Sequence, residues 1–195
     1  MTPTTLEAPV VVGPPSIADD GERYEIIDGK RVELPPMSAF ASRIASRIVF
    51  CINTFALQEI GEAVTDTLFR LPAPLERNRR PDGAFVSYKR WPKGQPQGIR
   101  DNAWDVVPDL AIEVVSPTDY AEDLLTKVDE YFRAGVSLVW VAYPSLRLIQ
   151  VYESMTRIRA VTATEELDGG AVLPNFRVAV ATLFPEAATN GGAQP

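Results

Sequence analysis

The stretch Leu110-Ala111-Ile112-Glu113-Val114-Val115 decides the fold, because it is a strand with apolar residues on both faces. Ser116-Pro117 is expected to open a helix directly after it, since proline is tolerated in a first helical turn. Gly135 is expected to close that helix. Residues 138–142 are again nearly all apolar, as in a central strand covered on both faces. The unit therefore predicts a parallel strand–helix–strand crossover, which is right-handed in almost all proteins.

Further elements are expected on both sides of this unit. Two short strands flank Asp28-Gly29, which is a typical hairpin turn, and together they span residues 24–34. Ser38 is expected to cap an amphipathic helix that ends near Gly61. More strands are expected at residues 64–71, 84–86, 146–152 and 158–161, and a loop at 88–104. The chain is therefore predicted to be an α+β protein with an α/β-like core, in which helices flank a mixed sheet.

Length and composition suit one domain. The chain has 195 residues, of which 46% are hydrophobic, and this is the size of a single domain with tails. Residues 1–20 are expected to be a flexible arm, 21–185 the folded domain and 186–195 a disordered tail. No secretory signal and no membrane-spanning stretch is evident. The one cysteine, Cys51, excludes an internal disulfide framework, so a cytoplasmic location is expected.

The chain has no histidine, which restricts its chemistry. A Ser-His-Asp or Cys-His site and a zinc site with histidine ligands are all excluded. Carboxylates remain, and they suit hard cations such as Mg²⁺ or Mn²⁺. The net charge of −7 argues against non-specific coating of nucleic acid, although it leaves room for a local basic site.

Three residues stand out as candidates for chemistry. Glu113 is a carboxylate inside a strand that is expected to be buried, so we expect it to be paired, protonated or bound to a metal, unless it lies at the exposed end of the strand or in a structural salt bridge. Asp82 follows Arg79-Arg80-Pro81 and is either a turn residue or a ligand. Lys127 lies on the flank of the apolar stripe of its helix. It either snorkels to solvent, pairs with Asp123 or Glu130, or leans toward Glu113.

Two further features bear on this site. Asp109 points to the same strand face as Glu113, because the two are four residues apart, so it is a rival ligand or a supporting group unless it is a plain turn residue. Residues 76–100 hold seven Lys or Arg against two acidic residues, a local charge of +5, while the remainder of the chain is −12. This basic segment surrounds Asp82 and is either a solvated loop or a contact for phosphates and bases. Its candidate contacts are Arg79, Arg80, Lys89, Arg90, Lys93 and Trp91.

These motifs, taken in order, resemble the Uma-type family. The matching segments are 24–29 (YEIIDG), 80–82 (RPD), 108–117 (PDLAIEVVSP), 127–131 (KVDEY) and 134–136 (AGV). The family is assigned to bacterial restriction endonucleases of the PD-(D/E)XK superfamily, and the resemblance runs from about Tyr24 to Phe184. It implies a restriction-endonuclease-like fold and a nuclease that hydrolyses DNA phosphodiester bonds.

The resemblance also implies a site. Asp82 and Glu113 would hold Mg²⁺ or Mn²⁺, and the backbone carbonyl of Val114 would add a ligand. The superfamily lysine, two residues after the glutamate, is replaced here by Val115, so its role would pass to Lys127. That lysine would orient or deprotonate the attacking water, or neutralise developing charge.

The chain departs from its relatives in two ways. The histidine that they often carry near the start of the first long helix is absent, and Phe40 and Ala41 are found there. The extra acid from that helix also has no counterpart, which leaves Glu25 and Glu33 as candidates to support the site.

Two other functions remain open beside an endonuclease. One is an inactive nucleic-acid-binding module on a nuclease fold, and the other is a dimeric interaction protein. A homodimer is expected for the nuclease, because cutting both strands of DNA requires two sites.

Overall fold

The computed structural model describes residues 22–98, 101–117 and 119–185. The predicted arm (1–20) and tail (186–195) lie outside these described residues.

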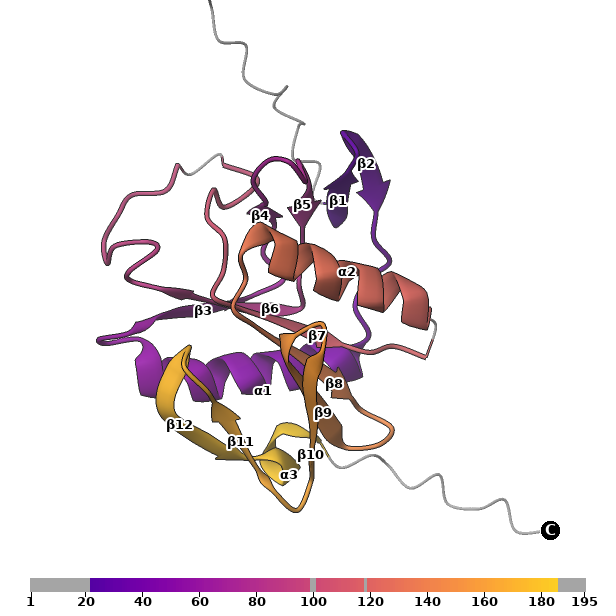
Figure 1. The fold of residues 1–195 in the computed structure, drawn as a ribbon, viewed down its shortest axis with the longest axis vertical. Helices are drawn as coiled ribbons and strands as arrows, with labels where there is room; N and C mark the ends of the chain where they lie inside the picture. The colour runs from indigo at the N-terminus through magenta and orange to yellow at the C-terminus, as the bar shows by residue number, and fades with distance from the viewer. Residues whose placement is uncertain (1–21, 99–100, 118, 186–195) are drawn as a thin grey trace, which may run out of the picture.

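The centre is a six-stranded sheet of order β10-β9-β8-β7-β6-β3. Helix α1 (Ala39–Ala56) packs on one face and helix α2 (Ala121–Ala134) on the other (Figure 1). The predicted α+β class with a mixed sheet between helices is confirmed. The strands are β3 (Gly61–Thr65), β6 (Gly83–Ser87), β7 (Leu110–Val114), β8 (Leu138–Tyr143), β9 (Leu148–Ser154) and β10 (Arg157–Thr162).

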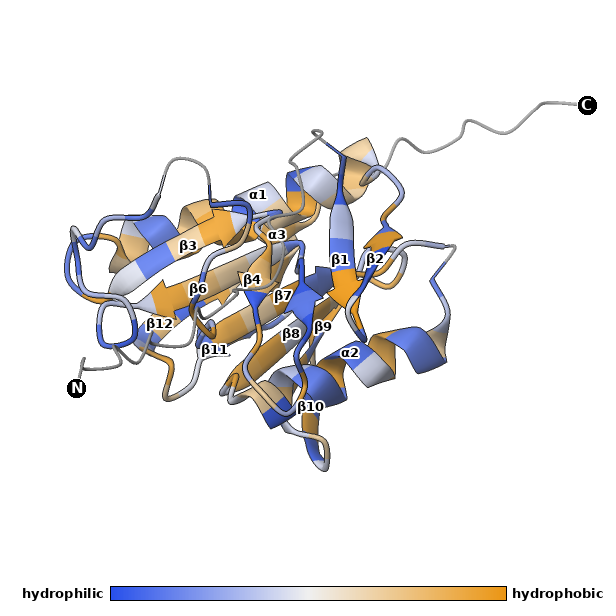
Figure 2. Ribbon diagram, turned by 90° about the horizontal axis from the view of Figure 1, so that it is seen from above, coloured by the Kyte–Doolittle hydropathy of each residue, from blue (hydrophilic) through white to orange (hydrophobic). Residues whose placement is uncertain are grey.

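The β7–α2–β8 unit forms as predicted, with β7 and β8 paired in parallel. Alternation along β7 directs Ile112 and its even-numbered neighbours toward α1, and Ala111 and Glu113 toward α2. Figure 2 shows that hydrophobic residues fill β6, β7 and β8 between the two helices. Strand β7 therefore carries one carboxylate into an otherwise apolar layer.

The predicted start of the second helix is wrong. Helix α2 begins at Ala121, after an extended Tyr120, and not at Ser116-Pro117. The backbone N–H of Ser116 donates to the Asp119 carboxylate at 2.7 Å, and this local turn replaces the first helical turn. Gly135 closes the helix as predicted, with a left-handed φ of 97°. The delayed start leaves the segment before α2 to line a pocket.

The hairpin forms as predicted, but it belongs to a second sheet. Strands β1 (Tyr24–Ile27) and β2 (Lys30–Glu33) flank a turn in which φ is positive at both Asp28 and Gly29. This sheet has the order β2-β1-β5-β4, with β5 (Asn78–Arg79) and β4 (Phe69–Arg70). The predicted continuous strand 64–71 is wrong, because Asp66 takes a positive φ of 48° and separates β3 from β4.

The last part of the chain forms elements that the sequence pattern did not predict. These are β11 (Glu166–Gly169), β12 (Leu173–Ala179) and the short helix α3 (Val180–Leu183). Their apolar residues pack into the same core as α1, on the side of the sheet away from α2. Among the described residues, no helix is long and apolar enough to cross a membrane.

Asn53 substitutes for a missing neighbour of the edge strand β3. Its side chain donates to the carbonyl of Ala63 and accepts from the N–H of Ala63, both at 2.8 Å. We expect Asn53→Ala to lower the free energy of unfolding by about 1–3 kcal/mol, because both backbone groups lose their partner. Denaturant unfolding measures this change. Thr54→Ala, at an exposed neighbouring position, is the control and should change it by less than about 0.5 kcal/mol; equal losses in both variants would contradict this role for Asn53.

Candidate active site

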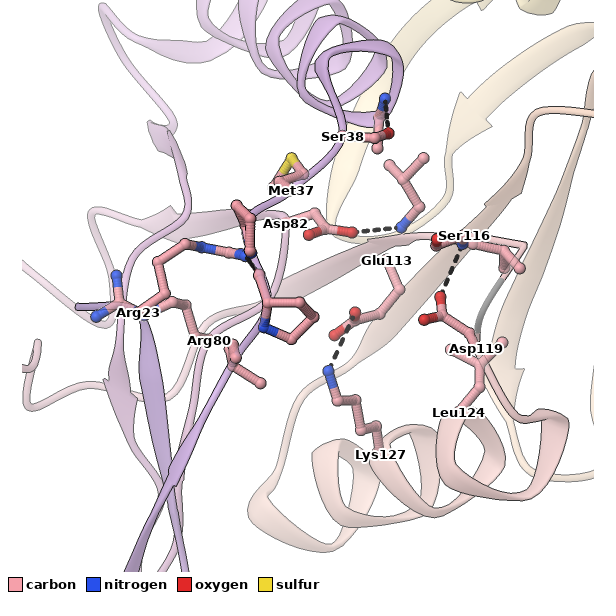
Figure 3. Close-up of a pocket in the computed structure, with 16 residues that line it drawn as sticks. Arg23, Met37, Ser38, Arg80, Asp82, Glu113, Ser116, Asp119, Leu124 and Lys127 are labelled. Carbon is pink, nitrogen blue, oxygen red and sulfur yellow. Dashed lines mark hydrogen bonds and ion pairs between the residues drawn. The ribbon is translucent and has the colours of Figure 1, made fainter.

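Strand register brings Asp82 beside Glu113. Strands β6 and β7 are antiparallel with Gly83 opposite Ile112, so the residue before Gly83 lies next to the residue after Ile112. The Asp82 carboxylate accepts a hydrogen bond of 2.7 Å from the backbone N–H of Val114. Both carboxylates line one pocket of about 200 Å³ at this end of the sheet (Figure 3).

Helix α2 supplies two partners for Glu113, which is only 6% exposed. The Tyr131 hydroxyl donates to one carboxylate oxygen at 2.6 Å, and the Lys127 ammonium lies 3.6 Å from the other. The two partners are four residues apart and therefore share a helix face. The sequence pattern did not predict the tyrosine contact, because the position of Tyr131 also fits the apolar stripe of the helix. A hydroxyl-bearing residue one turn beyond Lys127 was the available signal.

Lys127 leans toward Glu113, as one of the open alternatives expected. Its ammonium also lies 3.6 Å from the carboxylate of Glu25. Among the described ion pairs it pairs with neither Asp123 nor Glu130. The charge of Glu113 raises the pKa of Lys127 above its ordinary value, while burial opposes the rise. Lys127 is therefore an ammonium ion between two carboxylates.

A chain of buried charges lies behind the lysine. Arg79 is 4% exposed and donates to Glu25 and Glu130, each at 2.6 Å. Glu130 also pairs with Arg77 at 2.8 Å. The prediction that Arg79 contacts a DNA backbone is therefore wrong, because its guanidinium is buried and occupied at both ends. Glu25 joins this chain to Lys127 and lies next to the candidate site.

Asp82 is the carboxylate near the site that this network of ion pairs leaves without a balancing cation. The buried part of the network pairs three carboxylates with three cations: Glu25, Glu113 and Glu130 with Arg77, Arg79 and Lys127. The exposed Asp28 pairs with Arg77 at the outer end of the network. Asp82 has no ion pair within the described residues. Burial, and then the charge of Glu113, raise the pKa of Asp82 to about 7, although the Val114 N–H lowers it. Burial also raises the pKa of Glu113.

This excess of negative charge fits a divalent cation. Carboxylate and carbonyl oxygens are the donors that Mg²⁺ and Mn²⁺ prefer. The carboxylate donors in place are Asp82 and Glu113, and Val114, whose carbonyl is the third expected ligand, also lines the pocket. In the described part of the chain, no three Asp, Glu, His or Cys side chains gather in a metal-binding group. The protein ligands are therefore few, and the fit rests on the charge and the kind of donor.

Two predicted supporting acids lie elsewhere. Asp109 shares a strand face with Glu113, but it lies at the other end of β7, roughly 13 Å along the strand at ~3.3 Å per residue. There it accepts from the N–H of Ser87 at 2.7 Å and pairs with Arg90 at 2.9 Å. Glu33 is exposed on β2 and does not line the pocket. Both expectations of a supporting role are therefore wrong.

The predicted basic segment is divided by strand β6. Arg80 precedes the strand and lines the pocket, where it donates to the carbonyl of Asp66 at 2.7 Å. The remaining candidates follow the strand and lie at its far end, so the expectation that they flank Asp82 is wrong. These are the exposed Lys89, Arg90 bonded to the carbonyls of Val107 and Pro108, Trp91 packed against Trp104, and Lys93 bonded to the carbonyl of Gln58.

Arg23 also lines the pocket and was not predicted. Its guanidinium pairs with the Asp66 carboxylate at 2.8 Å and donates to the carbonyl of Pro35 at 2.6 Å. No local pattern signals this arginine, because its partners come from other parts of the chain. Asp119 and Ser116 line the opposite side of the same pocket (Figure 3).

The mixed sheet between helices is a restriction-endonuclease-like fold. The chain belongs to the Uma2 family, described as "Putative restriction endonuclease", whose family model matches residues 14–181. One similar solved structure is described as "a putative nuclease belonging to DUF820" from Anabaena variabilis. It is 19% identical, covers 86% of this chain and 93% of its own, and has a TM-score of 0.73. The fold is therefore shared with that protein, and no match was found among curated proteins.

Removing the buried arginine should unfold the site. We expect Arg79→Met to lower the free energy of unfolding by about 3–5 kcal/mol, because Glu25 and Glu130 would be left buried without their shared cation. Denaturant unfolding measures the loss. Lys89→Met, at an exposed cation, should stay within about 0.5 kcal/mol. A loss in Arg79→Met as small as that of the control would refute the buried network.

Neutralising Asp82 should instead stabilise the metal-free protein. The folded-state pKa of about 7 lies above the ordinary value of 3.8, so the folded state loses stability as pH rises between these two values. Asn carries no charge and can still accept from the Val114 N–H. In EDTA at pH 8, we expect Asp82→Asn to melt at a higher temperature than the native chain. This difference in melting temperature should narrow toward pH 5. Thermal unfolding at both pH values measures this difference.

The control is Glu59→Gln, which neutralises an exposed acid beyond the end of α1. A difference in melting temperature between Asp82→Asn and the native chain that does not depend on pH would count against the prediction.

Proposed function

We propose that the chain is an Mg²⁺- or Mn²⁺-dependent endonuclease that hydrolyses phosphodiester bonds in DNA. One observation carries the proposal: Asp82, Glu113 and Lys127 reach the same pocket from the start of β6, from β7 and from α2. Membership of the Uma2 family supports a nuclease. The unbalanced charge of Asp82 supports the use of a divalent cation.

Each residue has a distinct role in this proposal. Asp82, Glu113 and the Val114 carbonyl hold the cation, which supplies Lewis-acid stabilisation of the charge on the phosphate and the leaving group. Lys127 adds a fixed positive charge and orients the attacking water. Its place between two carboxylates favours this role over removal of a proton from the water. Tyr131 fixes one oxygen of Glu113, and Glu25 holds the lysine.

The assembly and the location are part of the same proposal. We propose a homodimer, because symmetric dimers are the commonest assembly of soluble proteins. Light scattering of the purified chain tests the dimer. A cytoplasmic location is proposed from the single cysteine.

Cleavage of supercoiled plasmid and of short single-stranded DNA tests the activity. The native chain is compared with Asp82→Ala, Glu113→Ala and Lys127→Met, in Mg²⁺, Mn²⁺ or EDTA. We expect cutting that needs the metal, is lost in the two alanine variants and falls at least about 100-fold in Lys127→Met. Lys89→Met, at an exposed lysine at the far end of β6, is the matched control and should cut like the native chain.

The possible outcomes separate the candidate functions. Equal cutting by all variants would indicate a contaminating nuclease or another site. No cutting by the folded native chain would refute the enzyme and favour a nucleic-acid-binding module, which should still bind DNA in a salt-dependent way. An absence of DNA binding at low salt would favour the interaction protein instead.

A further inference from the structure

The candidate ligands lie inside a recess. Glu113 is 6% exposed, and the pocket volume of about 200 Å³ is below the roughly 300–1,000 Å³ of typical small-molecule sites. One wall is the segment between β2 and α1, and the opposite wall is α2 with the turn before it (Figure 3). The phosphates of a regular duplex lie on the outside of a wide cylinder. A single flexible strand can bend into such a recess, whereas a duplex must first be distorted.

Half of the residues that line the recess are apolar. Leu34, Pro35, Pro36 and Met37 line one side, and Val115 and Leu124 line the other. Apolar side chains of this kind contact the face of a nucleobase that has left its stack. The bases of a duplex are already stacked on one another, so only an unpaired base can offer that face.

The charges around the recess also disfavour a duplex. Arg23 and Arg80 both pair with Asp66, at 2.8 and 4.0 Å. Lys127 pairs with Glu25 and Glu113, so the charge of the cations around the recess is partly compensated. Asp119 lines the rim, and the exposed Asp123 follows in the first turn of α2. Proteins that bind duplex DNA strongly make many phosphate contacts, often 6–10. The rim described here offers cations for about two, mainly through the remaining N–H groups of Arg23 and Arg80.

We infer that the substrate is single-stranded DNA, with one unpaired base held between residues 34–37 and Leu124 beside the phosphate that is cut. Arg23 and Arg80 contact a neighbouring phosphate in this arrangement. The inference rests on the proposed function and names the substrate class of the same site. It also covers an unpaired stretch within a longer duplex, because such a stretch offers the same free base.

Binding tests the inference separately from cutting. Fluorescence anisotropy with the Asp82→Asn chain in Mg²⁺ compares a labelled single strand with the same sequence as a duplex. We expect the single strand to bind at least about tenfold more tightly, which corresponds to ~1.4 kcal/mol. The logarithm of its affinity should fall with the logarithm of salt with a slope between roughly −1 and −2, as for two phosphate contacts. Equal or tighter binding of the duplex, or no binding of either, would overturn the inference.

A pair of proline variants locates the base. Pro36→Asp changes an exposed residue of the pocket wall, while Pro92→Asp makes the same change in the exposed loop after β6. We expect Pro36→Asp to weaken single-strand binding at least about tenfold and Pro92→Asp to leave it unchanged. Equal effects of the two variants would place the strand elsewhere and overturn the inference.

The cleavage assay separates this inference from the proposed function. If the native chain cuts duplex DNA better than single strands, the substrate inference fails and the endonuclease stands. If the chain prefers to bind single strands but cuts nothing, the inference about the ligand stands and the enzyme fails.

Discussion

A carboxylate carried by a strand that is buried on both faces is the constraint on which the structure of this site depends. Glu113 cannot stay charged in that position without partners, because an unpaired buried charge costs several kcal/mol. The structure surrounds it with a tyrosine hydroxyl and an ammonium group from α2. The ammonium group in turn requires Glu25, and Glu25 requires Arg79. The second sheet is therefore joined to the main domain by a chain of charges that begins at one residue of β7.

The parts of the site that sequence reasoning could predict are those with a local signature. Glu113 interrupts an apolar strand, Asp82 follows a proline before a strand, and Lys127 lies on the flank of a helical stripe. Each anomaly is visible within a few residues, and the hairpin turn at Asp28-Gly29 is equally local. The central strand–helix–strand unit was predictable for the same reason, because apolar periodicity is a local property.

The errors share a different physical origin, which is contact between distant parts of the chain. Arg79 looks like a surface cation in the sequence. The pairing of β1 with β5 places Glu25 against it, and helix α2 supplies Glu130. The expectation for Asp109 failed because two residues on the same face of a strand can lie at opposite ends of it, and Asp109 lies at the end of β7 away from Glu113. The start of α2 was misplaced because the Asp119 side chain competes for a backbone N–H that a helix would leave free. The basic segment was treated as one surface although a whole buried strand divides it.

The position of the lysine has a consequence for how such a site tolerates change. A lysine on the same strand as the glutamate would hold its distance through covalent backbone geometry alone. Here that distance is set by how α2 rests on the sheet, through Val128 and Tyr131 against Ala111, Val139 and Val141. The apolar layer therefore acts as the spacer between the two charged groups. A change in the volume of these core side chains would therefore alter the chemistry of the pocket without touching any polar residue.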